Sequence, residues 1–446
     1  METLVSSDVD RAAALLSAGQ VVAIPTETVY GLAANALDEE AVQKVFRLKN
    51  RPASDPLILH VGDAQALEKL GIETPYWAVR LIERFWPGPL TLLLPRGPHI
   101  SPTVTAGLPR VAVRAPAHPL VQTLLQKVSF PLAAPSANPF GRTSPTTPAH
   151  VYAYFAGQIP FILDGGPCSY GLESTIIGEE EGRFVLYRPG ALPRELLEEV
   201  LGERLVFRGS GARPQSPGQF LRHYAPTKPL LYGWENLPDE PLASLVYFTP
   251  PADLPDHPHL HVLSPDGRLE RAATHLYETI LRCEAEPTDF ILVQRLPTIG
   301  LGEALHDRLR RAAAQGLFLF NCPLEWATLA SLLHRYEIQA FLDLRRHTVS
   351  RHYPHLAQGP FQKALAEIGV LYEWQPVLTR LLFTLQRLRR EYAHIALFCV
   401  DTDAHKCISQ DLAARLENEG YTVFVVAPEG RLYLHQVSTS LRGKPT

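Results

Sequence analysis

Apolar runs of three to five residues recur through the first 207 residues, and their length predicts the strands of a sheet. Between some of them lie segments whose apolar positions have the spacing of an amphipathic helix. The predicted strands are 21–24, 57–61, 90–94, 111–114, 131–134, 161–163, 174–177 and 185–188, and the predicted helices are 8–19, 39–48 and 75–86. Because the two types mix without strict alternation, we expect one mixed, twisted, open α/β sheet in a domain over residues 1–207.

Residues 208–228 separate this pattern from a second one. They are rich in Gly, Ser and Pro, which predicts a linker, yet they carry aromatic residues that a spacer does not need. From residue 229 strands and helices alternate, which predicts a small parallel, Rossmann-like α/β domain over 229–315 and a third α/β domain over 316–446. The predicted strands are 230–233, 242–248, 260–263, 289–295, 317–320, 339–344, 395–400 and 421–426, and the predicted helices are 266–285, 302–314, 324–336, 360–368, 376–391 and 409–419.

Composition narrows the class of protein. The 446 residues carry a formal net charge of -4, so no global basic field draws the chain onto nucleic acid. There is no apolar run long enough for a bilayer and no signal-peptide pattern, so we expect a cytoplasmic protein with no membrane partner. Five cysteines without a closely spaced pair argue against a disulfide framework and against a zinc site, and they fit a reducing compartment.

Polar residues gather where the predicted strands end. In Pro25–Leu32 the hydroxyls of Thr26, Thr28 and Tyr30 alternate, so they would share one side of an extended chain, and Gly31 gives the backbone room to turn. The other candidates, at the ends of strands and helices or in the linker, are Lys49, Arg51, His60, Arg114, Ser136, Asn138, Ser144, Thr146, Ser174, Arg188, His223 and Tyr224. Neither a known phosphate-binding glycine loop nor a metal-binding motif accompanies them.

Each of these residues, taken alone, is explained at least as well by structure as by function. Two cations after a helix complement its negative end, and a serine and an asparagine close a turn. Taken together, they describe a site with at least four cations, many hydroxyls and no nucleophile beside a base. Such a site suits a polyanion such as a nucleoside triphosphate, which it would position and neutralise rather than attack.

A series of longer motifs follows over residues 9–200: PTETVYGL, LKNRP, PLILHV, WPGPLT, VAVRAPAHP, APSANPFGRTSPT, LDGG, GLESTII and YRPG. In this order they resemble the YrdC-type threonylcarbamoyl-AMP synthases. SPGQFLRHYAP in the linker and GLGEALHDRLRRAA after it resemble the long, two-domain form of that family, so the resemblance extends to about residue 315.

The last 130 residues resemble, more weakly, a small α/β family of uncharacterised function. That family usually continues its second cysteine as Cys-His-Arg, whereas this chain has Cys407-Ile408-Ser409, so any chemistry of that site does not carry over. A basic group remains there as a candidate anion or RNA patch, although a solvated charged loop is the interpretation we favour: Arg345, Arg346, Arg351 and His352.

The resemblance implies a YrdC-like fold and an enzyme, a nucleotidyltransferase. L-threonine, bicarbonate or carbon dioxide, and ATP would give threonylcarbamoyl-AMP and pyrophosphate, and a separate tRNA threonylcarbamoyl transferase complex would use the adenylate. The implied catalytic residues are Lys49 and Arg51; the implied ATP contacts are Lys49, Arg51, Asn138, Ser144, Thr146, Arg188, His223 and Tyr224; and the implied contacts to threonine or its carbamate are Thr26, Thr28, Tyr30, His60, Arg114, Ser136 and Ser174. Mg²⁺ would enter with ATP rather than in a protein cage. The linker would act as a lid that keeps water from the carbamate.

One alternative comes from the same residues: a protein that binds duplex RNA in the basic concavity, without turnover. It predicts tight, salt-sensitive RNA binding and no release of pyrophosphate. The weakly acidic net charge counts against it. The oligomeric state, the role of residues 316–446, direct contact with tRNA and the choice between carbon dioxide and bicarbonate stay open.

Overall fold

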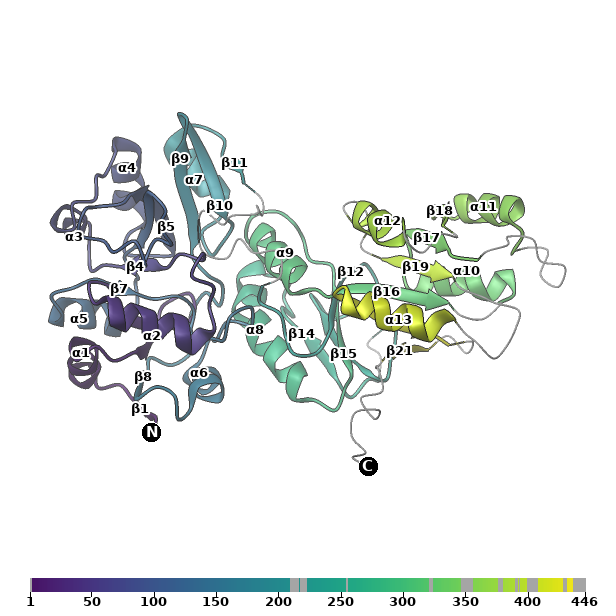
Figure 1. The fold of residues 1–446 in the computed structure, drawn as a ribbon, viewed down its shortest axis with the longest axis horizontal. Coiled ribbons are helices and arrows are strands. Elements are labelled where there is room, and N and C mark those ends of the chain that lie inside the picture. Colours follow the sequence, from purple (N-terminus) through teal and green to yellow (C-terminus); the bar gives the residue numbers. More distant parts are fainter. Residues whose placement is uncertain are drawn as a thin grey trace, which may run out of the picture.

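A computed structural model describes residues 2–208, 216, 223–253, 256–320, 324–345, 356–375, 380–389, 392, 394–398, 408–427 and 431–435. In this part of the chain three sheets follow one another along the longest axis of the molecule, with helices packed beside each (Figure 1). The prediction of a mixed α/β fold with parallel sheets is confirmed. Of the candidate basic patch, Arg346, Arg351 and His352 lie outside the described residues, as does Cys407.

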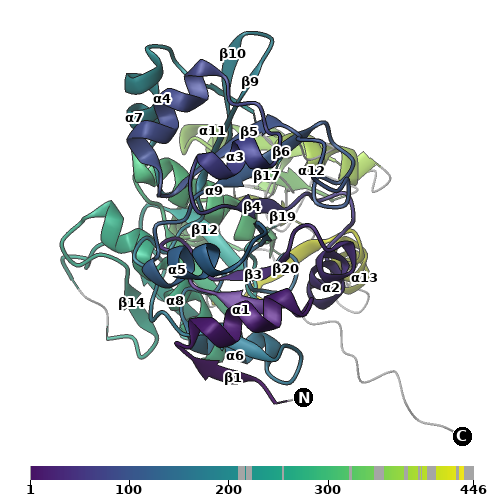
Figure 2. The ribbon, with the colours of Figure 1, turned by 90° about the vertical axis from the view of Figure 1, so that its left-hand side faces the viewer.

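The first sheet has eleven strands in the described residues, in the order β1-β8-β2-β3-β7-β4-β6-β5-β9-β10-β11. Its strands are β1 (Leu4–Ser6), β2 (Val22–Ile24), β3 (Gly31–Asn35), β4 (Ile58–His60), β5 (Leu90–Pro95), β6 (Arg110–Arg114), β7 (Leu132–Ala133), β8 (Phe161–Leu163), β9 (Thr175–Glu180), β10 (Arg183–Arg188) and β11 (Val206–Phe207). Its helices are α1 (Val9–Ser17), α2 (Glu39–Lys49), α3 (Gln65–Lys69), α4 (Tyr76–Phe85), α5 (Pro119–Lys127), α6 (Pro148–Phe155) and α7 (Arg194–Leu201). Parallel pairs such as β4 with β6 mix with antiparallel pairs such as β2 with β3, and the β9–β10 hairpin projects at one end (Figures 1 and 2).

The second and third sheets are mainly parallel. The second has the order β12-β15-β13-β14 and the third the order β18-β17-β19-β16-β20-β21, in which only β21 is antiparallel to its neighbour. The second contains β12 (Leu230–Trp234), β13 (Ala243–Tyr247), β14 (Leu260–Val262), β15 (Phe290–Gln294), α8 (Leu269–Ala285) and α9 (Leu301–Ala312). The third contains β16 (Gln315–Phe320), β17 (Ala340–Asp343), β18 (Leu371–Trp374), β19 (Ile395–Phe398), β20 (Tyr421–Val426), β21 (Leu432–Leu434), α10 (Trp326–Arg335), α11 (Gln358–Glu367), α12 (Leu381–Leu388) and α13 (Ile408–Asn418). In the described residues no helix is both long and apolar enough to cross a membrane.

Two local details differ from the sequence-based expectation. The segment after β2 is a bend rather than an extended chain, because the Thr26 hydroxyl accepts hydrogen bonds from the backbone N–H groups of Thr28 and Val29. Helix α2 ends at Lys49 because Asn50 adopts the left-handed conformation with φ 50°, two residues before the proline that was expected to stop it.

The second and third sheets share one apolar core. Trp234 of β12 packs edge-on against Phe318 of β16, and Phe290 of β15 packs in the same way against Phe424 of β20. The backbones approach closely enough that a Cβ at Gly316 would lie 2.5 Å from Leu231 Cδ2. The chain therefore passes from the second sheet to the third without a solvated gap.

The first and second domains meet around one buried carboxylate, that of Glu173. Arg308 of α9 places its Nε 2.7 Å from Glu173 Oε2, and the Tyr277 hydroxyl of α8 donates to the same carboxylate at 3.0 Å. Ser144 donates from the first domain at 2.6 Å. Burial would raise the pKa of Glu173, but Arg308 and Arg188 lower it to about 2. The carboxylate is therefore charged at neutral pH and ties the two domains together.

Replacing Arg308 with alanine should destabilise the protein by about 3–5 kcal/mol, because it leaves the Glu173 charge buried without its cation. Urea unfolding measures this loss. The control is Arg194→Ala, which breaks the half-buried interdomain pair with Glu303 and should cost about 0–1 kcal/mol. Equal losses in the two variants would contradict the prediction.

The free energy of unfolding should depend on pH in a way that Glu173 determines. Its pKa in the fold, about 2, lies below the ordinary value of 4.5, so its contribution is complete above pH 4.5 and is lost as the pH falls toward 2. The unfolding free energy of the wild type should therefore fall on acidification by roughly 3 kcal/mol more than that of Glu173→Gln. Parallel pH curves for the two proteins would contradict this assignment.

Candidate active site

A small buried pocket lies where the first sheet, the second domain and the end of the linker meet. Of the fifteen residues singled out in the sequence, eleven line it: Thr26, Thr28, Tyr30, Arg51, His60, Arg114, Ser136, Ser174, Arg188, His223 and Tyr224. Its cavity of about 50 Å³ is far smaller than the several hundred Å³ of a typical small-molecule site. The fold thus brings residues spread over two hundred positions of sequence to one place.

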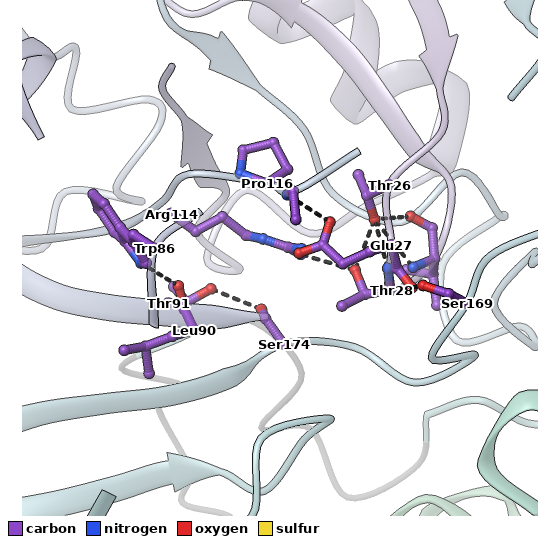
Figure 3. Close-up of polar contacts among 12 residues, drawn as sticks. Thr26, Glu27, Thr28, Trp86, Leu90, Thr91, Arg114, Pro116, Ser169 and Ser174 are labelled. Atoms are coloured by element: carbon purple, nitrogen blue, oxygen red, sulfur yellow. Dashed lines mark hydrogen bonds and ion pairs between the residues drawn. The ribbon is translucent and has the colours of Figure 1, made fainter. Parts of the chain in front are cut away.

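Arg114, at the end of β6, is held by the turn that follows β2 (Figure 3). Its Nη1 donates to the Thr28 hydroxyl at 2.8 Å and its Nη2 to Glu27 Oε1 at 2.6 Å. The second oxygen of Glu27 accepts from the backbone N–H of Ala117 at 3.0 Å, which fixes the carboxylate. Arg114 Nε is buried and has no hydrogen-bond partner in the described structure, so one edge of the guanidinium remains available to an anion.

Ser174 and Arg188 form a second rigid group on the opposite wall. The Arg188 guanidinium donates to the Ser174 carbonyl at 2.9 Å and to its hydroxyl at 3.0 Å. The Ser174 hydroxyl also lies 2.7 Å from that of Thr91 on β5 (Figure 3). Burial lowers the pKa of Arg188, which nevertheless remains a cation near neutral pH.

Arg51 follows α2 and turns back onto the loop after it. Its Nε and Nη2 donate to the carbonyls of Asp55 and Pro56 at 3.0 and 2.7 Å, and its Nη2 forms an ion pair with Asp55 at 2.8 Å. Lys49, two residues earlier, is buried and donates from Nζ to the carbonyls of Ser136 and Asn138. Burial and then the neighbouring Arg51 lower the pKa of Lys49 well below its ordinary value.

His60 and Tyr30 are uncharged members of the pocket. Burial, followed by the charge of Arg114, lowers the pKa of His60 to about 3, so its imidazole is neutral at physiological pH. The Tyr30 hydroxyl donates to the Gly166 carbonyl at 2.8 Å and accepts from the Gly165 N–H at 3.2 Å. Burial raises the pKa of this phenol, which leaves it a neutral hydrogen-bonding group.

The end of the linker closes the pocket from the side of the second domain. The His223 N–H donates to the Arg311 carbonyl at 3.1 Å, and Arg308 lies over the Tyr224 ring, 4.8 Å from its centroid. Tyr224 has φ 64°, a conformation that few residues other than glycine adopt. His223 Nδ1 and the Tyr224 hydroxyl are buried and have no hydrogen-bond partner among the described residues. Both polar atoms therefore retain hydrogen-bonding capacity that a bound ligand can satisfy.

Four predicted residues do not line the pocket but lie directly behind it. Besides Lys49, these are Asn138, Ser144 and Thr146. Asn138 Nδ2 donates to the carbonyls of Pro139 and Arg142 at 2.8 and 2.9 Å, and Thr146 contacts the ring of His150. In the described arrangement these residues support the wall rather than face the cavity, and their contact with a ligand stays a prediction.

The motifs in the sequence indicated the cations of the site but not the carboxylates that pair with them. Glu27 pairs with Arg114, Asp55 with Arg51, and Glu173 with Arg308 of the second domain. The site therefore combines four buried arginines with three carboxylates, and the buried Lys49, whose pKa is lowered, lies beside them. Glu27 and Arg308 both lie within quoted motifs, but Arg308 is 135 residues from Glu173, and no local pattern indicated that the two pair.

The pocket also lacks the geometry of covalent catalysis. Among the described residues, none of the hydroxyls that line it donates a hydrogen bond to a histidine or a carboxylate. What the pocket offers is a set of fixed cations and hydroxyls around a small cavity. Such an arrangement binds and orients anions and stabilises charge that develops on them.

Comparison with known proteins agrees with this arrangement. Residues 14–190 match the family model described as "Telomere recombination", and residues 192–314 match "Threonylcarbamoyl-AMP synthase, C-terminal domain". The threonylcarbamoyl-AMP synthase of Bacillus subtilis is 41% identical over 319 residues, covering 68% of this chain and 92% of the relative. That of Pyrococcus abyssi is 39% identical over 315 residues, covering 68% and 93%.

A solved structure shares the fold. The crystal structure of P. abyssi Sua5 complexed with L-threonine superposes with a TM-score of 0.64 at 35% identity, over 70% of this chain and 98% of the other. The matched parts include both the domain that carries the pocket and the domain that supplies Arg308. The chain belongs to the threonylcarbamoyl-AMP synthase family.

Proposed function

We propose that this protein is a threonylcarbamoyl-AMP synthase, a nucleotidyltransferase that joins L-threonine, carbon dioxide or bicarbonate, and ATP. The observation that carries the proposal is the enclosed pocket in which Arg51, Arg114 and Arg188 converge without a nucleophile and its base. The amine of threonine takes up carbon dioxide and loses a proton to become a carbamate. A carbamate oxygen then attacks the α-phosphorus of ATP, and the bond from that phosphorus to the bridging oxygen breaks to release pyrophosphate.

Arg114 is the proposed anchor for the threonine carboxylate. Glu27 and Thr28 hold two of its nitrogens, and its buried Nε has no hydrogen-bond partner among the described residues. Neutral His60 and the Ser174 hydroxyl lie in the same pocket and offer hydrogen bonds to the amine, the hydroxyl or the carbamate. A fixed carboxylate brings the nitrogen of the substrate to one position, which raises the effective concentration of the reacting groups.

Arg51, Arg188 and Lys49 are the proposed partners of the nucleotide phosphates. Each is held by backbone carbonyls, so no reorganisation is needed as charge develops on the leaving pyrophosphate. The described carboxylates of the pocket are already paired with arginines, which does not favour a dedicated metal cage. Mg²⁺ therefore fits as a companion of the ATP phosphates, whose charge it partly neutralises.

Nucleotide entry requires the linker end to move. A cavity of about 50 Å³ does not admit ATP while His223 and Tyr224 occupy one wall. Their unpartnered polar atoms and the positive φ of Tyr224 mark this segment, which contacts the first domain through Thr143 and the second through Arg311. We propose that this segment opens to admit ATP and closes to keep water from the carbamate.

The product would be passed to a separate tRNA threonylcarbamoyl transferase complex. The alternative, binding of duplex RNA without turnover, is less well supported, because the cations of the pocket are buried rather than displayed on a surface. Nucleic-acid phosphates are contacted from exposed grooves and patches. Binding of an RNA duplex by the wild type, in the absence of any pyrophosphate release, would favour the alternative.

Arg51→Ala should lower pyrophosphate release by about 100-fold or more, which is the usual cost of removing one preorganised charge donor. The assay contains ATP, Mg²⁺, threonine and bicarbonate. Arg47→Ala, on the exposed face of the same helix, is the matched control and should retain wild-type activity. Full activity of Arg51→Ala would remove it from the nucleotide site.

Arg114→Lys should raise the KM for threonine by roughly 10- to 100-fold, because a lysine cannot hold Glu27, Thr28 and a carboxylate at once. The KM for ATP should change little. Arg110→Lys, at the other end of the same strand and paired with Glu180, serves as the control. An unchanged KM for threonine would exclude Arg114 as the carboxylate anchor.

A further inference from the structure

A second group of chemically distinctive side chains lies in the second domain and does not line the active-site pocket. His261 of β14, Cys283 in the last turn of α8 and Glu286 at the end of that helix place one ligand atom each within 4.8 Å of one another. Cys283 is fully buried, and the other two side chains are largely buried. Imidazole, thiol and carboxylate in one cluster are the donor types of a transition-metal site.

The distances suit a tetrahedral ion. His261 Nε2 lies 2.9 Å from Glu286 Oε1, and Nδ1 of His259 lies 3.7 Å from Glu286 Oε2. With metal–ligand bonds of about 2.0–2.3 Å, donor atoms in a tetrahedral site stand about 3.3–3.8 Å apart. Each of the two imidazoles therefore lies within less than an ångström of that spacing from one oxygen of the carboxylate.

Local structure explains why these side chains converge. His261 belongs to β14, and His259 lies in the turn just before that strand, where its ring faces the Glu286 carboxylate. Cys283 and Glu286 are three residues apart at the end of a helix, on one face. The carboxyl end of a helix also carries partial negative charge, which favours a cation there.

Neighbouring groups orient two of the donors, whereas burial raises the pKa of the Cys283 thiol to about 12, so a metal ion has to displace its proton. Burial lowers the pKa of His261, which keeps its imidazole neutral. Burial would raise the pKa of Glu286, but the hydrogen bond from Ser244, at 2.6 Å, and His261 lower it, which keeps the group a carboxylate. The Ser244 hydroxyl orients that carboxylate, and the Thr288 hydroxyl lies 2.8 Å from the Ser244 hydroxyl. Such outer partners orient the ligands of metal sites.

A simpler interpretation is a His–Glu pair that serves only to stabilise the fold. It accounts for the contact between His261 and Glu286. It does not account for a second histidine facing the same carboxylate or for the buried thiol within 4.8 Å of both groups. Three donors of three chemical types within 4.8 Å of one another, with His259 beside the same carboxylate, are better explained by a shared ligand.

We propose that His261, Cys283 and Glu286, with His259 as the fourth ligand, bind one Zn²⁺ ion in each chain. The thiol excludes Mg²⁺ and Ca²⁺, which take oxygen ligands. On binding, the Cys283 S–H bond breaks, its proton goes to solvent and a sulfur–zinc bond forms. Four protein ligands leave no open position, so the ion is structural rather than catalytic.

The ion would strengthen an otherwise weak part of the second domain. Strand β14 is three residues long and lies at the edge of its sheet, paired with β13 alone. Zinc would tie it to the end of α8. There Glu284 holds Arg142 of the first domain at 2.7 Å, and Lys228 donates to the Cys283 carbonyl at 2.8 Å. The proposed ion would therefore stabilise the end of α8, which contacts the first domain through Glu284 and the end of the linker through the Cys283 carbonyl.

Metal content of the full-length protein tests the proposal. After exposure to Zn²⁺ and dialysis, inductively coupled plasma mass spectrometry should find one zinc per wild-type chain and less than about a tenth of that in Cys283→Ser and His261→Ala. Two matched controls should retain the zinc: Cys168→Ser, at the other buried free cysteine, and His275→Ala, in the same helix α8. Absence of zinc from the wild type, or its equal retention in all four variants, would overturn the proposal.

A second measurement does not depend on how well the variants fold. Chelation of zinc from the wild-type protein should lower its thermal midpoint by a few degrees, and Zn²⁺, but not Mg²⁺, should restore it. Co²⁺ in place of zinc should show the near-ultraviolet charge-transfer absorption of a thiolate ligand. A wild-type midpoint that is indifferent to chelation and to Zn²⁺, or a cobalt spectrum without that absorption, would contradict a site that contains Cys283.

Discussion

The buried ion pair between Glu173 and Arg308 links the folding of this protein to the assembly of its pocket. Glu173 belongs to the first domain and Arg308 to the second, and each is nearly inaccessible to solvent. Neither charge is tolerable there without the other, because several kcal/mol of desolvation would go uncompensated. The pair therefore holds the domains in the one arrangement that also brings Arg308 over Tyr224 and the linker end onto the pocket.

The same principle governs the rest of the pocket. Arg114 and Arg51 are each oriented by a carboxylate that the surrounding backbone holds in place. Such pairing reduces the net charge that must be buried and also fixes the direction in which each guanidinium points. Because these groups are already in position, the site needs little rearrangement when an anion binds. In the proposed function, selectivity for threonine and a nucleotide then depends on which nitrogens of the arginines have no partner in the chain.

The second domain takes a direct part in the site. It contributes Arg308 and Tyr277 to the Glu173 cluster, and the carbonyl of Arg311 receives the N–H of His223. Its own core continues into the third sheet through Trp234, Phe290 and their aromatic neighbours. A change in the third sheet can therefore reach the active site through packed elements, although the role of that sheet in the reaction is a separate question.

The sequence by itself determined the secondary structure where a pattern was long and periodic. The apolar stripes of α2, α4, α8 and α9 and the apolar strands β5, β13 and β15 were predicted to within a few residues, because burial on one face imposes their spacing. Short elements such as β1, β11 and α3 carried too few residues for a period to show. Helices α5 and α6 were missed although each begins with a favourable proline.

Motifs in the sequence also indicated most of the residues that line the pocket, since short strands and their loops keep neighbouring side chains together. Only the tertiary structure decided which carboxylate pairs with which arginine. It also decided that Lys49, Asn138, Ser144 and Thr146 lie behind the wall, and that His261 meets Cys283. These outcomes depend on contacts between segments far apart in the chain, and local spacing holds no information about such contacts. Charge pairing in a buried site is set by the packing of whole elements, and that packing exists only once the chain has folded.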